Sequence, residues 1–234
     1  NSNVPNEDAR AVELEDSSLF ARNRVPGDDR VEDNVRITYG LDWQLDRRDL
    51  TIQANVGQSY RLSSNASILP DGTGLSDRKS DVVGRVEVRW LDRVDVTTRF
   101  RLDKDDATLR RFELDATVGS RTSYGTVGYL RLNRDVSGSV EDLRDREEIR
   151  FGGRLQISPY WSVFGSGIID LTGVNEDPLA TTDGFTPIRT RLGVAYDDDC
   201  LTVSITWRRD YQDTGDALQG DSILFRLSFR NLGV

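Results

Sequence analysis

Apolar and polar residues alternate along most of this chain. Between Val35 and Leu45 every odd-numbered residue is apolar or aromatic, and every even-numbered residue is polar or glycine. Successive side chains of a strand point to opposite faces, so this pattern predicts a strand with one apolar and one polar face. The same alternation recurs at 50–62, 94–102, 111–118, 149–157, 201–208 and 223–230, with further strand-like segments at 81–91, 124–134, 160–171 and 187–197. We expect about eleven strands and no helix.

The predicted strands are long, and the links between them alternate in length. The strands run to about 10 to 12 residues, which is close to the tilted membrane-spanning length. Short links fall at 46–49, 92–93, 121–123, 158–159 and 198–199; longer polar links fall at 63–80, 135–146, 172–186 and 211–220, and only the link at 104–107 is brief among them. Outer-membrane barrels have short periplasmic turns and long external loops. The chain is therefore predicted to be all-β, an antiparallel up-and-down meander forming part of an outer-membrane β-barrel.

The two faces of the predicted strands carry different side chains. Aromatic residues lie mostly toward strand ends, as in an interfacial girdle, although a β-sandwich core would also place aromatics in strands; they are Tyr39, Trp43, Tyr60, Trp90, Phe100, Tyr160, Trp161, Trp207 and Phe229. Arginines and acids share the other face, at Arg85, Glu87, Arg89, Arg99, Arg101, Arg111, Glu113, Asp115, Arg150, Arg154, Arg189 and Arg191. We expect most of these charges to support neighbouring strands, with some able to meet a charged passenger.

The amino-acid composition excludes several kinds of catalytic and binding site. The chain has 234 residues, 31 basic and 40 acidic side chains, no histidine and one cysteine. Without histidine there is no Ser-His-Asp or Cys-His catalysis and no HExxH zinc site. The acidic balance argues against non-specific nucleic-acid binding, which requires a basic surface. No apolar run is long enough for a membrane-spanning helix, whereas a β-barrel is compatible with this composition. We therefore expect neither an enzyme nor a cofactor.

Residues 1–34 differ from the rest of the chain. They are polar and loop-like, with too few apolar side chains for a core of their own. The sequence divides into this loop segment, external or folded inward, and a barrel region at 35–234.

Several motifs follow one another along the chain. The first runs from Leu19 to Asp33 and contains Leu19, Phe20, Asn23, Arg24, Gly27, Asp29, Arg30 and Asp33. It is followed by Thr38-Tyr39-Gly40, by 57–61, by 71–77, and near the end by 192–200, 207–211 and 225–233. In this order the motifs resemble those of the LptD family of outer-membrane lipopolysaccharide-assembly proteins. The sequence departs from the family at Val25, Asp28 and Val31, where relatives often have aromatic residues.

The resemblance implies that this chain is one part of a larger protein. Family members have a periplasmic β-jellyroll followed by a very large barrel, and this chain resembles the C-terminal part of that barrel. In the family an LptE-type lipoprotein plugs the barrel, and lipopolysaccharide arrives over a periplasmic bridge through the jellyroll. It leaves for the outer leaflet between the first and last strands. The last strand here, with Ile223, Phe225, Leu227 and Phe229 on its apolar face, would form one side of that lateral gate.

The resemblance also gives Cys200 a role. In the family a cysteine at this late position forms a disulfide with the N-terminal jellyroll, and the oxidising periplasm would preserve such a bond. Relatives often have two adjacent cysteines here, whereas residue 199 is aspartate in this chain, so one such bridge is the maximum. A free, small apolar side chain is the alternative.

Other interpretations remain open. The alternative is a self-contained outer-membrane channel or adhesin of about twelve strands. An outer-membrane lipase or protease, or a soluble sandwich hydrolase, is disfavoured by the missing histidine. The carboxylates of Asp103, Asp105 and Asp106, and those of 197–199, lack the spacing of a calcium loop, and we expect solvated turns there.

Overall fold

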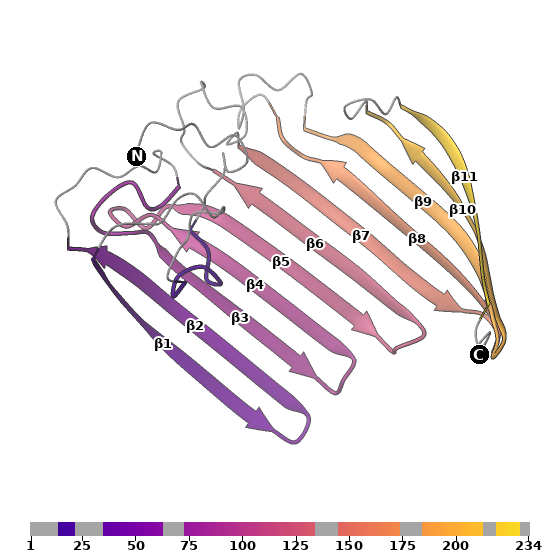
Figure 1. Cartoon of the computed structure of the whole chain (residues 1–234), viewed down its shortest axis with the longest axis horizontal. Helices are drawn as coiled ribbons and strands as arrows, with labels where there is room; N and C mark the ends of the chain where they lie inside the picture. The colour runs from indigo at the N-terminus through magenta and orange to yellow at the C-terminus, as the bar shows by residue number, and fades with distance from the viewer. Residues whose placement is uncertain are drawn as a thin grey trace. The chain divides into compact units, whose positions relative to one another are not determined.

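A computed structural model of the chain describes residues 14–21, 35–62, 73–133, 145–173, 184–212 and 219–229. These residues form one sheet of eleven strands in which every strand lies beside its neighbours in sequence (Figure 1). The strands are β1 (Arg36–Arg47), β2 (Leu50–Arg61), β3 (Val82–Trp90), β4 (Val94–Leu102), β5 (Leu109–Gly119), β6 (Tyr124–Leu132), β7 (Arg146–Gln156), β8 (Trp161–Asp170), β9 (Thr186–Asp197), β10 (Leu201–Asp210) and β11 (Gly220–Phe229). The predicted meander of about eleven long strands is confirmed. Among the described residues there is no helix of the length and apolarity needed to cross a membrane.

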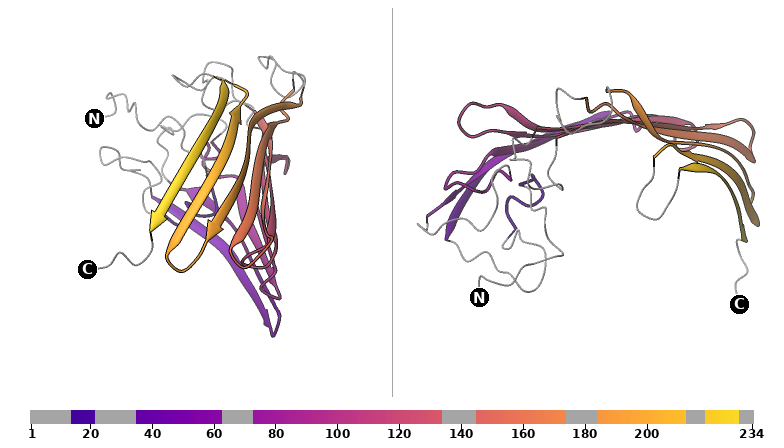
Figure 2. Two further views of the ribbon diagram at one scale, coloured as in Figure 1. Left: turned by 90° about the vertical axis from the view of Figure 1, so that its right-hand side faces the viewer. Right: turned by 90° about the horizontal axis from the view of Figure 1, so that it is seen from above.

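The chain divides into two compact units. The first consists of Asn1–Val88, Thr97–Glu113 and Arg131–Asp145, and the second of Arg89–Val96, Leu114–Leu130 and Arg146–Val234. In each unit the strands form a single layer (Figure 2).

Strand pairing fixes which residues share a face. In the second unit β9 and β10 are antiparallel partners, with Val194 opposite Ile205 and Arg191 opposite Arg208. The next pair continues both rows, because Ile205 lies opposite Phe225, and Arg208 opposite Ser222. Residues of one parity therefore form an apolar face and those of the other a polar face, as the alternation predicted.

The apolar face of these strands has no protein covering it within the described residues. Large side chains are more than half exposed along it, including those of Leu155 at 58%, Leu192 at 56%, Ile205 at 54% and Ile223 at 76%. An exposed apolar surface of this extent normally contacts lipid or another protein.

The buried apolar core of the described residues lies on the polar face of the first unit. The segment 14–21 lies on one side of the strands there (Figure 2, right). Its Leu14 and Leu19 are buried together with Leu75 and Val83. Val83 has the same parity in β3 as Arg85 and Glu87, so this small core interrupts an otherwise charged surface.

The short links are tight turns. Leu91 and Asp92, between β3 and β4, both adopt positive φ angles, of 53° and 51°. Two successive residues in the left-handed region give the reversed turn whose twist matches that of a two-stranded hairpin. Links of this kind join the long strands directly, so few residues lie outside the sheet at this end.

Candidate functional site

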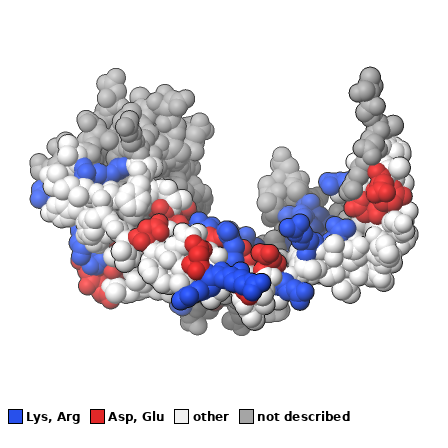
Figure 3. Space-filling model, turned by 90° about the horizontal axis from the view of Figure 1, so that it is seen from below, with Lys and Arg blue, Asp and Glu red and all other residues white. Residues whose placement is uncertain are grey.

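The polar face of the first unit carries a row of ion pairs across β3, β4 and β5. Arg85 Nη2 lies 2.7 Å from Glu87 Oε2. Arg99 Nη1 lies 3.3 Å from Glu113 Oε2, and Arg111 Nε donates to Glu113 Oε1 over 2.9 Å. Basic and acidic side chains lie next to one another in Figure 3. The Arg99–Glu113 pair links β4 to β5, as expected for strand support, whereas the other two pairs join residues two positions apart on one strand.

An N-terminal segment, Leu14–Ala21, binds to this charged face, and we call it the strap. The backbone N–H of Leu14 donates to the Thr73 carbonyl oxygen over 3.0 Å. Glu15 Oε1 lies 2.9 Å from Arg111 Nη1, and Asp16 Oδ1 lies 3.9 Å from Arg99 Nε. At the other end the Ala21 carbonyl accepts a hydrogen bond from Arg36. The strap is thus held at both ends and by its acidic side chains.

Two glycines make room for the strap. Gly40 of β1 and Gly57 of β2 are direct cross-strand partners. A Cβ atom at Gly57 would overlap with Leu19 Cδ2, and a Cβ atom at Gly40 would lie 3.5 Å from the ring of Phe20. Without side chains at this pair, the apolar residues of the strap can approach the backbone of the sheet.

A buried arginine holds the 73–81 loop, whose Thr73 carbonyl also accepts the hydrogen bond from Leu14 of the strap. Arg101 of β4 is only 1% exposed. Its Nη1 donates to the Thr73 carbonyl over 3.1 Å, and its Nε lies 3.4 Å from Asp81 Oδ2. Asp81 Oδ1 in turn accepts a hydrogen bond from the Lys104 N–H over 3.2 Å. Burial raises the pKa of Asp81, and the positive charge of Arg101 opposes that rise.

The loop around this arginine requires a glycine. Gly74 has a φ angle of 76°, in the left-handed region. A Cβ atom there would lie 2.8 Å from Asp81 Oδ2 and 3.2 Å from Arg101 Cδ. The loop residues Thr73, Gly74 and Leu75 therefore pack directly against the ion pair and the strap.

This arrangement is suited to holding a segment of chain in place. Its arginines and acids pair with one another. Within the described parts of the chain no three His, Cys, Asp or Glu side chains gather in a way that would hold a metal ion. The site is therefore a fixed surface on which positive and negative side chains alternate.

The structure brings together residues from several of the sequence motifs. The predicted Leu19 and Phe20 meet Gly40, Gly57 and the 73–75 loop, which came from separate motifs. The remaining residues of the first motif, Asn23, Arg24, Gly27, Asp29, Arg30 and Asp33, lie outside the described residues. The roles of Leu14 and Asp81 could not be predicted from the sequence, because a single leucine in a polar segment and a single aspartate in a loop give no periodic signal.

Cys200 lies in the short link between β9 and β10, where it is exposed. Its backbone N–H donates to Asp198 Oδ1 over 2.8 Å, and the N–H of Leu201 donates to the same oxygen over 2.7 Å. This carboxylate therefore caps a turn, as the sequence predicted. The thiol is accessible to a partner from outside the link.

The last strand, β11, pairs with β10 from Gly220 to Phe229 and has one neighbour among the described strands. Ile223, Phe225, Leu227 and Phe229 share its apolar face and are between 47% and 76% exposed. Leu224, on the other face of β11, is also 58% exposed, so both faces of this strand are uncovered by the described residues.

Comparison with known proteins places the chain in a family. A sequence model described as LptD, LPS transport system D, matches residues 1–161. The chain is 25% identical over 243 residues to an LPS-assembly protein LptD of Albidiferax ferrireducens, covering 98% of this chain and 29% of that protein. It is 26% identical over 243 residues to the LptD of Xylella fastidiosa strain Temecula1, covering 99% of this chain and 28% of that protein. The chain thus spans under a third of the length of these relatives. With its eleven-stranded meander and a family match over most of its length, this chain belongs to the LptD family.

Proposed function

We propose that this chain is the C-terminal part of the barrel of an outer-membrane lipopolysaccharide-assembly protein. The observation that carries the proposal is the separation of the two faces. In the second unit large apolar side chains such as Leu192 and Ile205 are exposed on one face, and Arg191 and Arg208 lie on the other. In the first unit the ion pairs and the strap share one face. A transmembrane barrel has this arrangement, with its apolar face in lipid and its polar face toward a wet interior.

The polar face would line the path of lipopolysaccharide. Its arginines, among them Arg150, Arg189 and Arg208, offer planar donors suited to phosphate groups. Residues 1–34 would then fold inward, with the strap as their attachment to the wall. The protein would act as a conduit for lipopolysaccharide, and without histidine it has no Ser-His or Cys-His pair.

The partners follow from this location. We expect an LptE-type lipoprotein plug inside the barrel, and an N-terminal jellyroll that receives lipopolysaccharide from a periplasmic bridge. Cys200, on a short link, would form a disulfide with that jellyroll. Non-reducing electrophoresis of the full-length protein tests this: Cys200→Ser should abolish a mobility shift that reductant also abolishes. An unchanged shift in the variant would refute the disulfide.

We further propose that β11 forms one side of a lateral gate. A gate in hydrocarbon must open without exposing a full ladder of unpaired backbone groups, so its two strands must pair incompletely. β11 contributes an apolar face of four large side chains and a backbone edge not paired by the described strands.

Site-specific photocrosslinking in cells tests transport and gate together. Benzoylphenylalanine at Ser166, on the polar face of β8, should crosslink lipopolysaccharide on its way through the barrel. At Phe225 of β11 it should crosslink lipopolysaccharide at the exit, whereas at Val194, on the same face of an interior strand, it should not. Crosslinking at Ser166 without Phe225 would refute the gate, and crosslinking at neither position would refute the transport path.

A self-contained channel or adhesin barrel is the alternative. It predicts that the 234-residue chain alone gives a heat-modifiable band and single-channel conductance in a planar bilayer. Under our proposal the chain alone gives neither, because it is one part of a larger barrel.

A further inference from the structure

Three glycines lie side by side on the apolar face of β6, β7 and β8. Gly153 and Gly165 are direct cross-strand partners. A Cβ atom at Gly153 would lie 3.5 Å from the Cα of Gly125 on the other side. The adjacent Gly152 faces the opposite way, toward Thr126 Oγ1 and the Cβ of Ser166. The three glycines therefore leave a strip of bare backbone on the apolar face.

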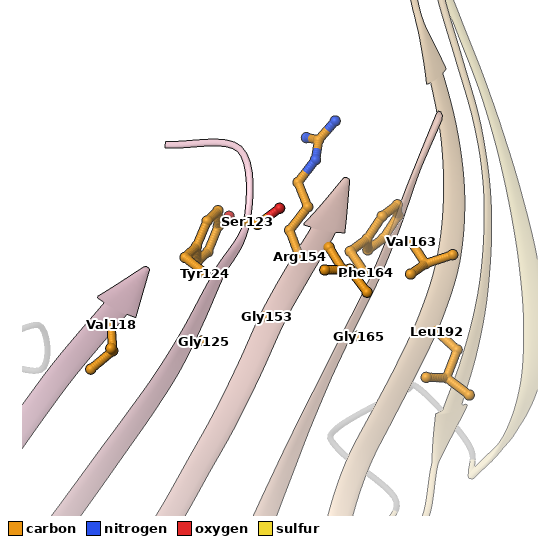
Figure 4. Close-up of a pocket in the computed structure, with 11 residues that line it drawn as sticks. Val118, Ser123, Tyr124, Gly125, Gly153, Arg154, Val163, Phe164, Gly165 and Leu192 are labelled. Carbon is orange, nitrogen blue, oxygen red and sulfur yellow. The ribbon is translucent and has the colours of Figure 1, made fainter. Parts of the chain in front are cut away.

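Apolar side chains border this strip and turn it into a groove of about 600 Å³. Val118 of β5 and Leu192 of β9 lie on the strands at its two ends (Figure 4). Leu155 and Val163 lie beside the glycines on β7 and β8. We call this depression the glycine groove.

The glycine groove has the length of one lipid chain. From β5 to β9 it crosses four interstrand spacings of about 4.8 Å, or about 19 Å in all. One leaflet of a bilayer's hydrocarbon core is about 15 Å thick, which is the extent of one acyl chain. The volume is also in the range of natural ligand sites, about 300 to 1,000 Å³.

Aromatic residues lie directly beside the groove. Trp161 is two residues from Val163 on the same face of β8, and its ring centroid lies 5.2 Å from that of Tyr196. The ring centroid of Tyr160 lies 5.9 Å from that of Tyr196. Tryptophan and tyrosine concentrate at the level of lipid headgroups. A lipid with its headgroup at this aromatic cluster would therefore have its chain at the depth of the groove.

From this geometry we infer that the glycine groove holds one acyl chain of a membrane lipid as a retained, specific ligand. The inference rests on the proposed function, which puts this face in the bilayer. Ser123, Tyr124 and Arg154 also line the groove, and the other lining side chains offer hydrocarbon contacts. The backbone of Gly153 and Gly165 is already paired in the sheet, so most of the groove suits an apolar ligand.

The test uses the full-length protein in lipid nanodiscs made with phosphatidylethanolamine that carries a diazirine in one acyl chain. After illumination, peptides containing Leu155, Val163 or Leu192 should be labelled severalfold more than the peptide containing Ile205, which lies on the same face outside the groove. Equal labelling at the groove and at Ile205 would overturn the inference while leaving the proposed membrane location intact. Folded protein unlabelled at both places would overturn the membrane location itself.

Variants make the test specific to the groove. Gly125→Leu should fill it and reduce labelling of the groove peptides severalfold, since a Cβ atom there meets only the Gly152 carbonyl oxygen, at 4.0 Å. Gly165→Ala should give a smaller reduction, because its Cβ would meet only the mobile end of Leu192 at 3.0 Å and the Arg191 carbonyl oxygen at 3.3 Å. Gly220→Leu is the matched control, with nothing within 4 Å of its Cβ, and should leave labelling unchanged. Unchanged groove labelling in folded Gly125→Leu and Gly165→Ala would contradict the inference.

Discussion

Leu19 lies against the backbone of Gly57, in space that any side chain at that position would occupy. The two residues are 38 positions apart and belong to different sequence motifs. Their contact explains why a glycine stands in the middle of a long strand, where it otherwise weakens pairing.

Gly57→Ala should therefore release the strap. The added methyl group meets Leu19 and lies 2.9 Å from the Tyr39 carbonyl oxygen, and overpacking of this kind costs about 1 to 3 kcal/mol. We expect faster proteolysis within residues 1–34 of the variant in membranes. Gly220→Ala, with open space around its Cβ, should be cleaved at the wild-type rate. Equal cleavage of the Gly57 variant and wild type would show that the strap does not depend on this contact.

Arg101→Leu should be more damaging than most single changes in this chain. It leaves the Asp81 carboxylate buried without its nearest cation, and breaking a buried pair in this way costs about 3 to 5 kcal/mol. The urea midpoint of the protein in detergent micelles should fall accordingly. Adding Asp81→Asn should restore part of the loss, because the unpaired charge is gone. A double variant less stable than Arg101→Leu would contradict a role for the ion pair.

The turn between β4 and β5 should contribute a pH-dependent stability. Asp103 Oδ1 accepts the Asp105 N–H over 2.9 Å, and this hydrogen bond, followed by those from Arg110 and the Asp106 N–H, lowers the pKa of Asp103 below its ordinary 3.8. The folded pKa is the lower one, so the stabilisation is present above the unfolded value and is lost as pH falls through the folded value. The pKa of Asp81 is raised, so its contribution has the opposite sign.

Comparison with Asp103→Asn tests this contribution. The substitution also lowers the pKa of Asp81, because the negative charge of Asp103 is one of the causes that raise it. Wild type should be the more stable at about pH 6, and the difference in urea midpoint should shrink toward about pH 3 as Asp103 takes up a proton. A difference in urea midpoint that stays constant over this pH range would contradict a contribution from the charge of Asp103.

Neighbouring residues of β10 test which face meets lipid. Ile205→Lys places a charge on the apolar face and should cost up to about 2 to 4 kcal/mol if the residue is near the middle of the membrane. Thr206→Lys places the same charge on the polar face, opposite Leu224 and Gly193, and should be tolerated. The readout is the yield of folded, heat-modifiable full-length protein in the outer membrane. Equal yields would contradict the assignment of the faces.

The strands were predictable because the alternation is a local property. The run from Val35 to Leu45 indicates a strand and its two faces from neighbouring residues alone, and the observed β1 begins at Arg36 and ends at Arg47. The segment 124–134 alternates poorly, and the structure supplies the reason in part: Gly125 and Gly128 stand on opposite faces of β6, so each face has one position without a side chain.

The strap and the glycine groove could not be predicted in this way. Leu14 stands alone in a polar segment, and its burial depends on Thr73, Leu75 and Val83, which are brought to it by folding. The three glycines of the groove are likewise far apart in sequence and meet only through strand register.

By itself the sequence determined the number of strands, their two faces, the placement of tight turns and the resemblance to LptD, because each depends on residues within a few positions of one another. The tertiary structure decided where the strap binds, why Gly40 and Gly57 lack side chains, which carboxylate pairs with buried Arg101, and where bare backbone lies open on the apolar face. These features depend on close approach between distant segments, which steric fit and charge pairing select only once the strands are side by side.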